Sequence, residues 1–268
     1  MKDTVKKVYT QMFKEDERLC GNNASSVEYL TNMKYISNEL KKNDNILELG
    51  AATGRYTIPL AIQGYQITAL EYVQENLDVL KGKLTGDMNV EAIQGDAKDL
   101  SRFSDNSFDV VLNMGPLYHF PDKSDREQVV SETMRVLKPG GTAFFAFISN
   151  DMVFVTESLM YSENFLSNDN NLYNKETHKI SDDPFTVLTI DSIRELMLKF
   201  KCDEFKFIAS DGYAELLADQ INKLNEEQFE LYMKYHYYMC EKKEILGASH
   251  HLLYITKKGW LIWNRIIN

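Results

Sequence analysis

Short apolar runs alternate with helix-like segments between residues 46 and 148, and this alternation constrains the fold more than any other feature of the sequence. Strands separated by helices of about ten residues are typical of βαβ units, which build a parallel sheet. Right-handed crossovers place helices on both faces of such a sheet. We therefore predict an α/β fold with strands at residues 46–49, 66–70, 90–94, 108–114 and 142–148.

The segments between these strands are predicted to form helices at residues 54–63, 74–84 and 124–137. Pro59 is compatible with the first helix if it falls in or near the first turn. Ser124 and Glu127 fit a capping box at the start of the third helix. Residues 27–40 place apolar side chains three or four positions apart, which predicts another amphipathic helix before the first strand.

The second half of the chain departs from simple alternation. Residues 150–186 are rich in Asn and Asp and are expected to be irregular, whereas residues 213–245 are expected to form a long helical stretch. We also predict a helix at 190–200 and strands at 204–209 and 251–256. We expect three regions: a helical lid segment at 1–44, a core at 45–149, and a part at 150–268 that completes the sheet and carries both insertions as a cap.

The composition argues against several classes of protein. The net charge is −10 and the longest basic cluster is Lys257-Lys258, so we expect no nucleic-acid partner. No apolar run approaches the ~20 residues that span a membrane, and the N-terminus lacks the apolar segment of a signal peptide. Three scattered cysteines argue against a disulfide framework or a zinc cluster. We expect a cytoplasmic protein with reduced thiols.

Ligands of a parallel sheet bind beyond the carboxyl ends of its strands, at the switch in strand order. The first loop at this edge is Glu48-Leu49-Gly50-Ala51-Ala52-Thr53-Gly54-Arg55. Its glycines permit a tight turn, and the following helix turns its N-terminal N–H groups toward a ligand. Glycine-bearing turns of this kind occur in many α/β proteins, so a purely structural role is the alternative.

Three further loops at this edge carry candidate residues. Glu71 ends the second strand about 20 residues after Gly50, where a carboxylate accepts both hydroxyls of a ribose; an exposed strand-end Glu is the alternative. Asp96 follows the third strand and is a candidate acceptor for an adenine amino group, or an ordinary turn residue. After the fourth strand, Gly115-Pro116 marks a turn that delivers Tyr118 and His119 to the switch point.

Together, these segments resemble class I S-adenosylmethionine-dependent methyltransferases over about residues 44–149. The family's first motif is an acidic residue followed by alternating glycines, which Glu48, Gly50 and Gly54 match. Its basic-Pro-Gly-Gly turn matches Lys138-Pro139-Gly140-Gly141. Ala52 departs from the family, which has its middle glycine there. The Ala52 Cβ either crowds the methionine portion of the cofactor or fits if φ is negative.

The resemblance implies a Rossmann-like sheet of seven mostly parallel strands, helices on both faces, and a helical cap from the N-terminus and the late insertions. It implies S-adenosyl-L-methionine as cofactor, S-adenosyl-L-homocysteine as product, and a small-molecule acceptor, as in bacterial members of unassigned substrate. The cofactor-binding residues it implies are Glu48, Gly50, Ala51, Ala52, Gly54, Arg55, Glu71, Tyr72, Asp96, Ala97, Asn113 and Met114.

Methyl transfer to a nucleophile in line with the sulfonium depends mainly on proximity and orientation. A base is needed only when the acceptor must lose a proton. His119 is the candidate base, because imidazole titrates near neutrality, with Tyr118 as its partner or as a wall of the acceptor pocket. The alternatives are a hydrogen-bonded structural histidine and a core tyrosine.

Several residues outside the core are weaker candidates. Tyr9 and Arg18 are candidates to close over the cofactor, with Arg18 pairing its carboxylate. Adjacent side chains on a strand point in opposite directions, so the pair His250-His251 predicts no metal site. The aromatic residues of the late helical stretch spread around more than one helix face, so some must pack in the core: Tyr232, Tyr235, His236, Tyr237 and Tyr238.

Three other functions compete with this interpretation. A nicotinamide-dependent oxidoreductase needs glycine at positions 52 and 55, where this chain has Ala52 and Arg55. Amino-directed DNA methyltransferases carry Asp/Asn-Pro-Pro-Tyr/Phe after the fourth strand, which Asn113-Met114-Gly115-Pro116 does not match. A catalytically silent cofactor-binding regulator stays open, since fold does not establish function. The acceptor atom and the oligomeric state, monomer or homodimer, stay open as well.

Overall fold

The computed structural model describes residues 21–166, 172–181 and 185–259. Its strands are β1 (Asn45–Leu49), β2 (Gln66–Glu71), β3 (Val90–Gln94), β4 (Phe108–Asn113), β5 (Leu137–Ser149), β6 (Val187–Leu188), β7 (Lys206–Ala209) and β8 (His251–Lys257). Its helices are α3 (Asn23–Glu39), α4 (Thr57–Ile62), α5 (Gln74–Lys83), α6 (Lys123–Val136), α7 (Asn150–Thr156), α8 (Ile190–Lys199), α9 (Ala218–Ile221) and α10 (Glu226–Met239). Shorter helical turns are η2 (Pro116–His119), η3 (Glu157–Tyr161) and η4 (Lys243–Ala248).

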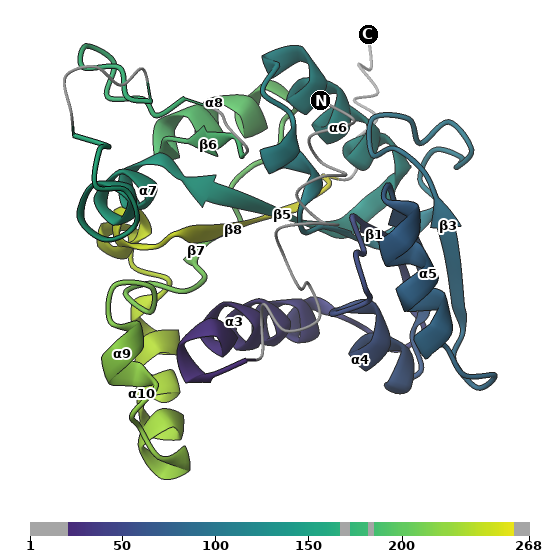
Figure 1. The fold of residues 1–268 in the computed structure, drawn as a ribbon. Coiled ribbons are helices and arrows are strands. Elements are labelled where there is room, and N and C mark those ends of the chain that lie inside the picture. Colours follow the sequence, from purple (N-terminus) through teal and green to yellow (C-terminus); the bar gives the residue numbers. More distant parts are fainter. Residues whose placement is uncertain (1–20, 167–171, 182–184, 260–268) are drawn as a thin grey trace, which may run out of the picture.

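All eight strands form one sheet, with seven of them in the order β3-β2-β1-β4-β5-β8-β7 and β6 paired to β5 (Figure 1). The pairs from β3 to β5 are parallel, whereas β8 runs antiparallel to both of its neighbours. The predicted seven-stranded, mostly parallel sheet is confirmed, with the two-residue β6 as an addition. The order reverses between β1 and β4, so the switch point lies where the candidate loops leave the sheet.

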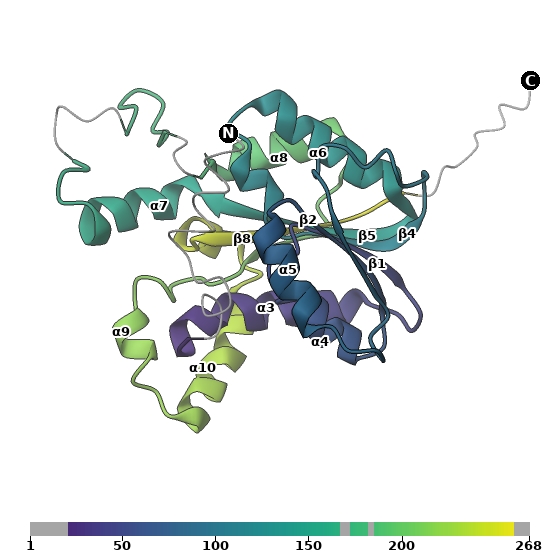
Figure 2. The same ribbon diagram turned by 45° about the vertical axis from the view of Figure 1, so that its right-hand side comes forward.

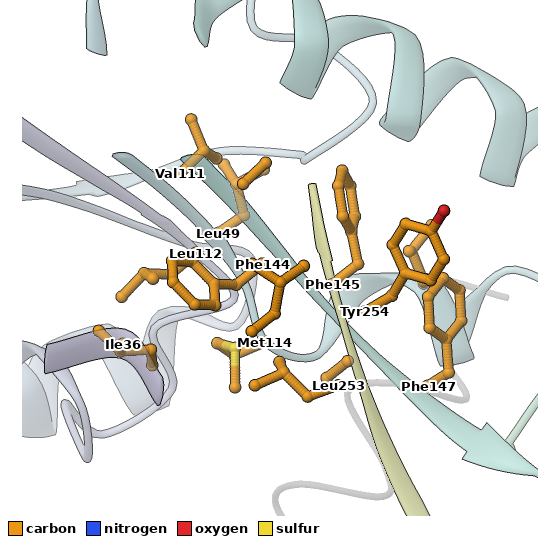
Figure 3. Packing of buried hydrophobic residues seen from close by; sticks show 14 of the residues in the cluster. Ile36, Leu49, Val111, Leu112, Met114, Phe144, Phe145, Phe147, Leu253 and Tyr254 are labelled. Carbon is orange, nitrogen blue, oxygen red and sulfur yellow. The ribbon is translucent and has the colours of Figure 1, made fainter. Parts of the chain in front are cut away.

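Helices cover the sheet on both sides. Figure 2 shows α6 and α8 on one face and α3, α4 and α5 on the other. The core follows the alternation of side chains along β4 and β5. Phe144 lies on the side of Ile36 from α3, whereas Phe145 and Tyr254 point to the opposite face (Figure 3). All four side chains are fully buried, and burial of each stabilises the fold by about 1.5–3 kcal/mol.

The first helices start at slightly different places from those predicted. The residue Gly54 is still left-handed, with φ of +91°, so α4 begins only at Thr57. Pro59 is the third residue of α4 and lies in its first turn, as expected. The N-cap of α6 is Asp122, with no side-chain cap, so the capping box predicted at Ser124 is wrong.

The two insertions differ more from the prediction. Residues 150–186 begin with α7, because Ser149 caps the helix by accepting the N–H of Met152. Residues 213–245 are not one long helix: a capping box between Asn225 and Gln228 starts α10 as a separate element. α9 and α10 pack against α3 through a small apolar cluster that includes Val27 and Met233. None of the described helices has both the length and the apolar character needed to cross a membrane.

Candidate functional site

The turn after β1 is joined to the end of β2 through its backbone. The N–H groups of Gly50 and Ala51 both donate to the carbonyl oxygen of Leu70, at 2.9 and 3.1 Å. Gly50 has φ of +74°, and an added Cβ there lies only 2.9 Å from Pro116 Cδ. A Cβ on Gly54, at φ +91°, lies 2.5 Å from Leu80 Cδ1. Both glycines of the motif are therefore required by the packing of the turn itself.

Ala52 occupies the left-handed region that the family fills with glycine. Its φ is +46°, so the alternative in which alanine fits through a negative φ is wrong. An L-residue in this region costs roughly 1–2 kcal/mol. The strained residue donates its N–H to Glu71 Oε2 at 2.8 Å, so this hydrogen bond offsets part of the cost.

Glu71 is a buried carboxylate that joins the predicted loops. Its other oxygen accepts the N–H of Val73 at 2.7 Å. The N–H of Gly95, in the loop after β3, donates to the Glu71 carbonyl at 3.0 Å. The exposed strand-end alternative for Glu71 is therefore wrong. Glu71 is a buried carboxylate beside the switch point, between the loops after β1, β2 and β3.

Glu48 is the second buried carboxylate, one residue before the end of β1. Thr57 Oγ1 donates a hydrogen bond to Glu48 Oε2 at 2.5 Å. Burial raises the pKa of Glu48 to about 8, and the nearby charge of Glu71 adds to the increase. In the folded protein, Glu48 is thus largely protonated at neutral pH.

The loops after β2 and β3 lie side by side. Gln94 Nε2 donates to the carbonyl oxygen of Tyr72 at 3.2 Å. Asp96 is half-buried, and its Oδ1 accepts the N–H of Lys98 at 2.9 Å, which is the turn role weighed as the alternative to adenine binding. Ala97 is buried beside it. The structure therefore brings Tyr72, Asp96 and Ala97 together next to Glu71.

The loop after β4 combines a buried amide with aromatic rings. Asn113 is fully buried; its Nδ2 donates to Thr133 at 3.4 Å, and its Oδ1 has no hydrogen-bond partner. Tyr118 Oη donates to the carbonyl oxygen of Met114, itself buried, at 3.3 Å. The His119 ring lies 4.8 Å from the Tyr118 ring and 5.5 Å from the Phe185 ring. His119 thus belongs to an aromatic cluster at the edge of the sheet.

The helix α3 belongs to the predicted lid segment at 1–44, and it contacts the turn after β1 through side chains that the sequence analysis did not single out. The Arg55 guanidinium lies 3.9 Å from the centre of the Tyr29 ring, so this candidate cofactor residue contacts α3. Asn32 Nδ2 also donates to Tyr56 Oη at 3.1 Å. The predicted lid residues Tyr9 and Arg18 lie outside the described residues.

A buried polar cluster lies where β7 ends and β8 begins. The Asp211 carboxylate accepts a hydrogen bond from His251 Nδ1 at 2.7 Å, and Glu28 of α3 lies 3.5 Å from the same nitrogen. The sequence analysis weighed His251 only as a metal ligand and did not consider the loop after residues 204–209. Asp211 could have been found there, because it lies two residues after the end of a predicted strand.

Two remaining expectations concern α10 and metals. Within α10, His236 is buried whereas Tyr235 and Tyr238 are exposed, so the predicted spread of its aromatic residues around several faces is confirmed. Among the described residues, no three His, Cys, Asp or Glu side chains lie close enough to hold a metal ion.

Comparisons with known proteins agree with this geometry. Residues 47–145 match the family described as "Methyltransferase domain". The demethylmenaquinone methyltransferase of Clavibacter sepedonicus is 37% identical over 98 residues, which are 37% of this chain and 38% of that protein. The cypemycin N-terminal methyltransferase of a Streptomyces species is 34% identical over 100 residues, which are 37% of this chain and 40% of that protein. The chain thus spans less than half of the length of these curated relatives.

One solved structure extends the likeness in fold to nearly the whole chain. It is a SAM-dependent methyltransferase from Archaeoglobus fulgidus, with a TM-score of 0.59 at 16% identity. The superposition covers 92% of this chain and 100% of the other. At this level of identity the likeness concerns the fold, and it includes the segments beyond the core match.

Proposed function

We propose, from the premise that residues 47–145 form a methyltransferase domain of the class I, Rossmann-like kind, that the protein transfers a methyl group from S-adenosyl-L-methionine to a small-molecule acceptor. The observation that carries this proposal is the buried Glu71 carboxylate. It accepts N–H groups from Ala52 and Val73 and so lies between two candidate cofactor loops. A carboxylate at this place suits the two hydroxyls of a ribose.

The described residues fit the remaining parts of the cofactor. Asn113 Oδ1 is a buried acceptor with no hydrogen-bond partner, and the amino group of the methionine portion is a donor of the kind it lacks. Asp96 and Ala97 adjoin Glu71 and are the proposed contacts of the adenine. Glu71 supplies negative charge to a ligand that carries a sulfonium, and Glu48 adds to this charge once it loses its proton. Arg55 acts through Tyr29, by holding α3 over the turn.

The bound cofactor supplies an activated methyl group whose leaving group is a neutral thioether. The chain's own residues then have to orient the acceptor and exclude water. Tyr118 and His119, with Phe185, are the proposed aromatic wall of the acceptor pocket. His119 stays a predicted base, and the variants His119→Phe and His251→Gln test this role.

The cap is proposed to consist of the segments outside the core sheet. The two insertions meet where Tyr161 Oη donates to Glu215, which joins the end of η3 to the loop before α9. α9 and α10 pack on α3, so the insertion at 213–245 and the helical part of the segment at 1–44 are continuous. Tyr9 and Arg18 lie outside the described residues and stay predicted lid residues.

Calorimetric titration of the full chain with S-adenosylmethionine tests the proposal. We expect binding in the micromolar range, weakened at least about 100-fold in Glu71→Ala because two buried N–H groups and the ribose lose their acceptor. Glu91→Ala, which removes an exposed Glu from the neighbouring strand β3, is the matched control and should bind as the wild type does. A folded wild type that binds no S-adenosylmethionine contradicts the proposal, as does a Glu71→Ala variant with unchanged affinity.

A further inference from the structure

The cluster around Asp211 lies at the same edge of the sheet as the cofactor loops. β7 runs parallel to β5, because both are antiparallel to β8, and Asp211 follows the end of β7. His251 is the first residue of β8 and pairs with Ile148, next to the end of β5. The mechanism described so far does not use either residue.

Asp211 is a buried carboxylate surrounded by donors. Its Oδ1 accepts from Ser249 Oγ at 2.5 Å and from the N–H groups of His250 and His251 at 2.9 and 3.1 Å. Its Oδ2 accepts from His251 Nδ1 at 2.7 Å. Burial alone raises the pKa of a carboxyl, but the contacts with His251 and Ser249 outweigh it and hold the pKa of Asp211 below its usual value. Asp211 is therefore ionised at neutral pH and can only accept hydrogen bonds.

This geometry fixes the tautomer of His251. Because the Asp211 carboxylate only accepts, the proton of the His251 ring must sit on Nδ1. Glu28 Oε2, 3.5 Å from the same nitrogen, favours the same arrangement. In the neutral ring, the lone pair is then on Nε2. About a quarter of the His251 side chain is exposed (24%).

The helix α3 contacts both this cluster and the turn after β1. Glu28 contacts His251, and the next residue, Tyr29, contacts Arg55 in the turn after β1. Consecutive Cα atoms are about 3.8 Å apart. The histidine and the cofactor loop therefore lie against neighbouring residues of one helix.

We propose that His251 is the general base of methyl transfer, that Asp211 is its positioning residue, and that the acceptor is an amine. This inference rests on the proposed function and adds to it the acceptor class and the path of the proton. It assigns His119 to the wall of the pocket.

The step balances without any further reactant. A protonated amine gives one N–H proton to His251 Nε2 and becomes neutral, which frees the nitrogen lone pair. The lone pair forms a bond to the methyl carbon as the carbon–sulfur bond breaks, with its electron pair going to sulfur. The products are a methylated ammonium, a neutral thioether and an imidazolium, which releases its proton to solvent.

The charges around the ring favour this acceptor. Glu28 and Asp211 both face Nδ1, so the imidazolium formed by proton transfer lies beside two carboxylates. The adjacent ring of His250 is buried and its pKa is lowered by that burial, so it adds no positive charge at neutral pH. On the α10 side, His236 is also kept neutral by burial, and Glu215 adds further negative charge near His250. The negative charge around the ring attracts a cationic ammonium, whereas it repels an anionic acceptor.

Activity measurements on the full chain test the acceptor class. The probes are a panel of primary amines that includes 2-phenylethylamine, beside 2-phenylethanol and 2-phenylethanethiol, which share its carbon skeleton. Release of S-adenosylhomocysteine is followed from pH 6 to 10. We expect turnover of the amines alone. Faster turnover of the alcohol or the thiol overturns the assignment, and so does a wild type that binds S-adenosylmethionine but methylates no amine.

Variants test the base. We expect His251→Gln to lower kcat by about 10²–10⁴-fold and to abolish the acidic limb of its pH profile, with cofactor affinity unchanged. Asp211→Asn should shift the pH at which the acidic limb of the kcat profile falls. Glu91→Ala, on an exposed residue of β3, is the control and should behave as the wild type. A His251→Gln variant that keeps its rate, or loses it equally at every pH with weakened cofactor binding, overturns the proposal.

Histidine ¹⁵N spectra of the same proteins report on the pair without any acceptor. We expect the Nδ1–H tautomer at His251 in the wild type and its loss in Asp211→Asn. The Nε2–H tautomer in the wild type overturns the inference. Failure of the proposed function shows separately, as absent S-adenosylmethionine binding in the calorimetric titration.

Discussion

Glu48 and Glu71 lie near the ends of the neighbouring strands β1 and β2, and the charge of Glu71 adds to burial in raising the pKa of Glu48 to about 8. Two buried carboxylates at one edge repel each other when both are ionised. The folded protein relieves this repulsion by keeping Glu48 protonated at neutral pH. A positively charged ligand removes the need for that proton.

The stability of the unliganded protein should therefore fall as pH rises. The pKa of Glu48 is about 8 in the folded state and about 4.5 when unfolded, so between these values the folded state holds the extra proton. The contribution of this proton to the free energy of unfolding is fully present below pH 4.5. Between pH 4.5 and pH 8 it decreases by about 1.4 kcal/mol per pH unit. Urea unfolding of the wild type against Glu48→Gln at pH 5 to 9 measures this difference. Parallel curves for the two proteins contradict it.

Cofactor affinity should change with pH in the opposite direction. S-adenosylmethionine is cationic at its sulfonium, and a nearby cation lowers the pKa of a carboxyl. We expect its dissociation constant to fall as pH rises from 6 to 8, with protons released on binding. Calorimetry in two buffers of different ionisation enthalpy measures this release. The release should disappear in Glu48→Gln, and a variant that still releases the same number of protons refutes the role of Glu48.

Replacing Ala52 with glycine should stabilise the protein. Ala52 is left-handed, with φ of +46°, and glycine reaches this region without the clash of Cβ. After the larger entropy loss of glycine is subtracted, we expect a gain of about 1 kcal/mol in the free energy of unfolding. Thermal and urea unfolding measure it. A loss of stability would show that the Ala52 Cβ makes a favourable contact that outweighs the strain.

Replacing His119 with phenylalanine distinguishes a role in the wall of the acceptor pocket from a role as general base. Phenylalanine keeps a ring beside Tyr118 and Phe185 but cannot take a proton. We expect KM for the acceptor to change and kcat to fall less than about tenfold, against the about 10²–10⁴-fold loss typical of a missing base. Steady-state kinetics with the amine probes decide between them. A collapse of kcat in His119→Phe, with His251→Gln unaffected, restores His119 as the base.

The core of the fold was predictable because its signals are local. Strand and helix periods, together with the glycines at 50 and 54, mark each βα unit within about 20 residues. The sequence also held the Asn225–Gln228 capping box, whose recognition would have divided the predicted helix at 213–245. The N-cap of α6 at Asp122 was missed because its side chain makes no capping hydrogen bond.

The proposed donor and acceptor halves of the site differ in the same way. Glu71 could be predicted as a candidate because it lies a fixed distance along the chain from Gly50. Asp211, His251 and Glu28 come from a loop, a strand and a helix that only the folded chain brings together. Neither the contact of Arg55 with Tyr29 nor the left-handed φ of Ala52 has a signature in residue spacing.

The contact between Gly50 and Pro116 has an evolutionary consequence. Pro116 begins η2, the turn that carries Tyr118 and His119, and its ring occupies the space that a Cβ at position 50 would need. A side chain acquired at position 50 would displace the turn that faces the acceptor. Position 50 is therefore expected to stay glycine in homologues that keep proline at position 116, so a lineage can alter the proposed acceptor preference through this turn only while the loop after β1 keeps its glycine.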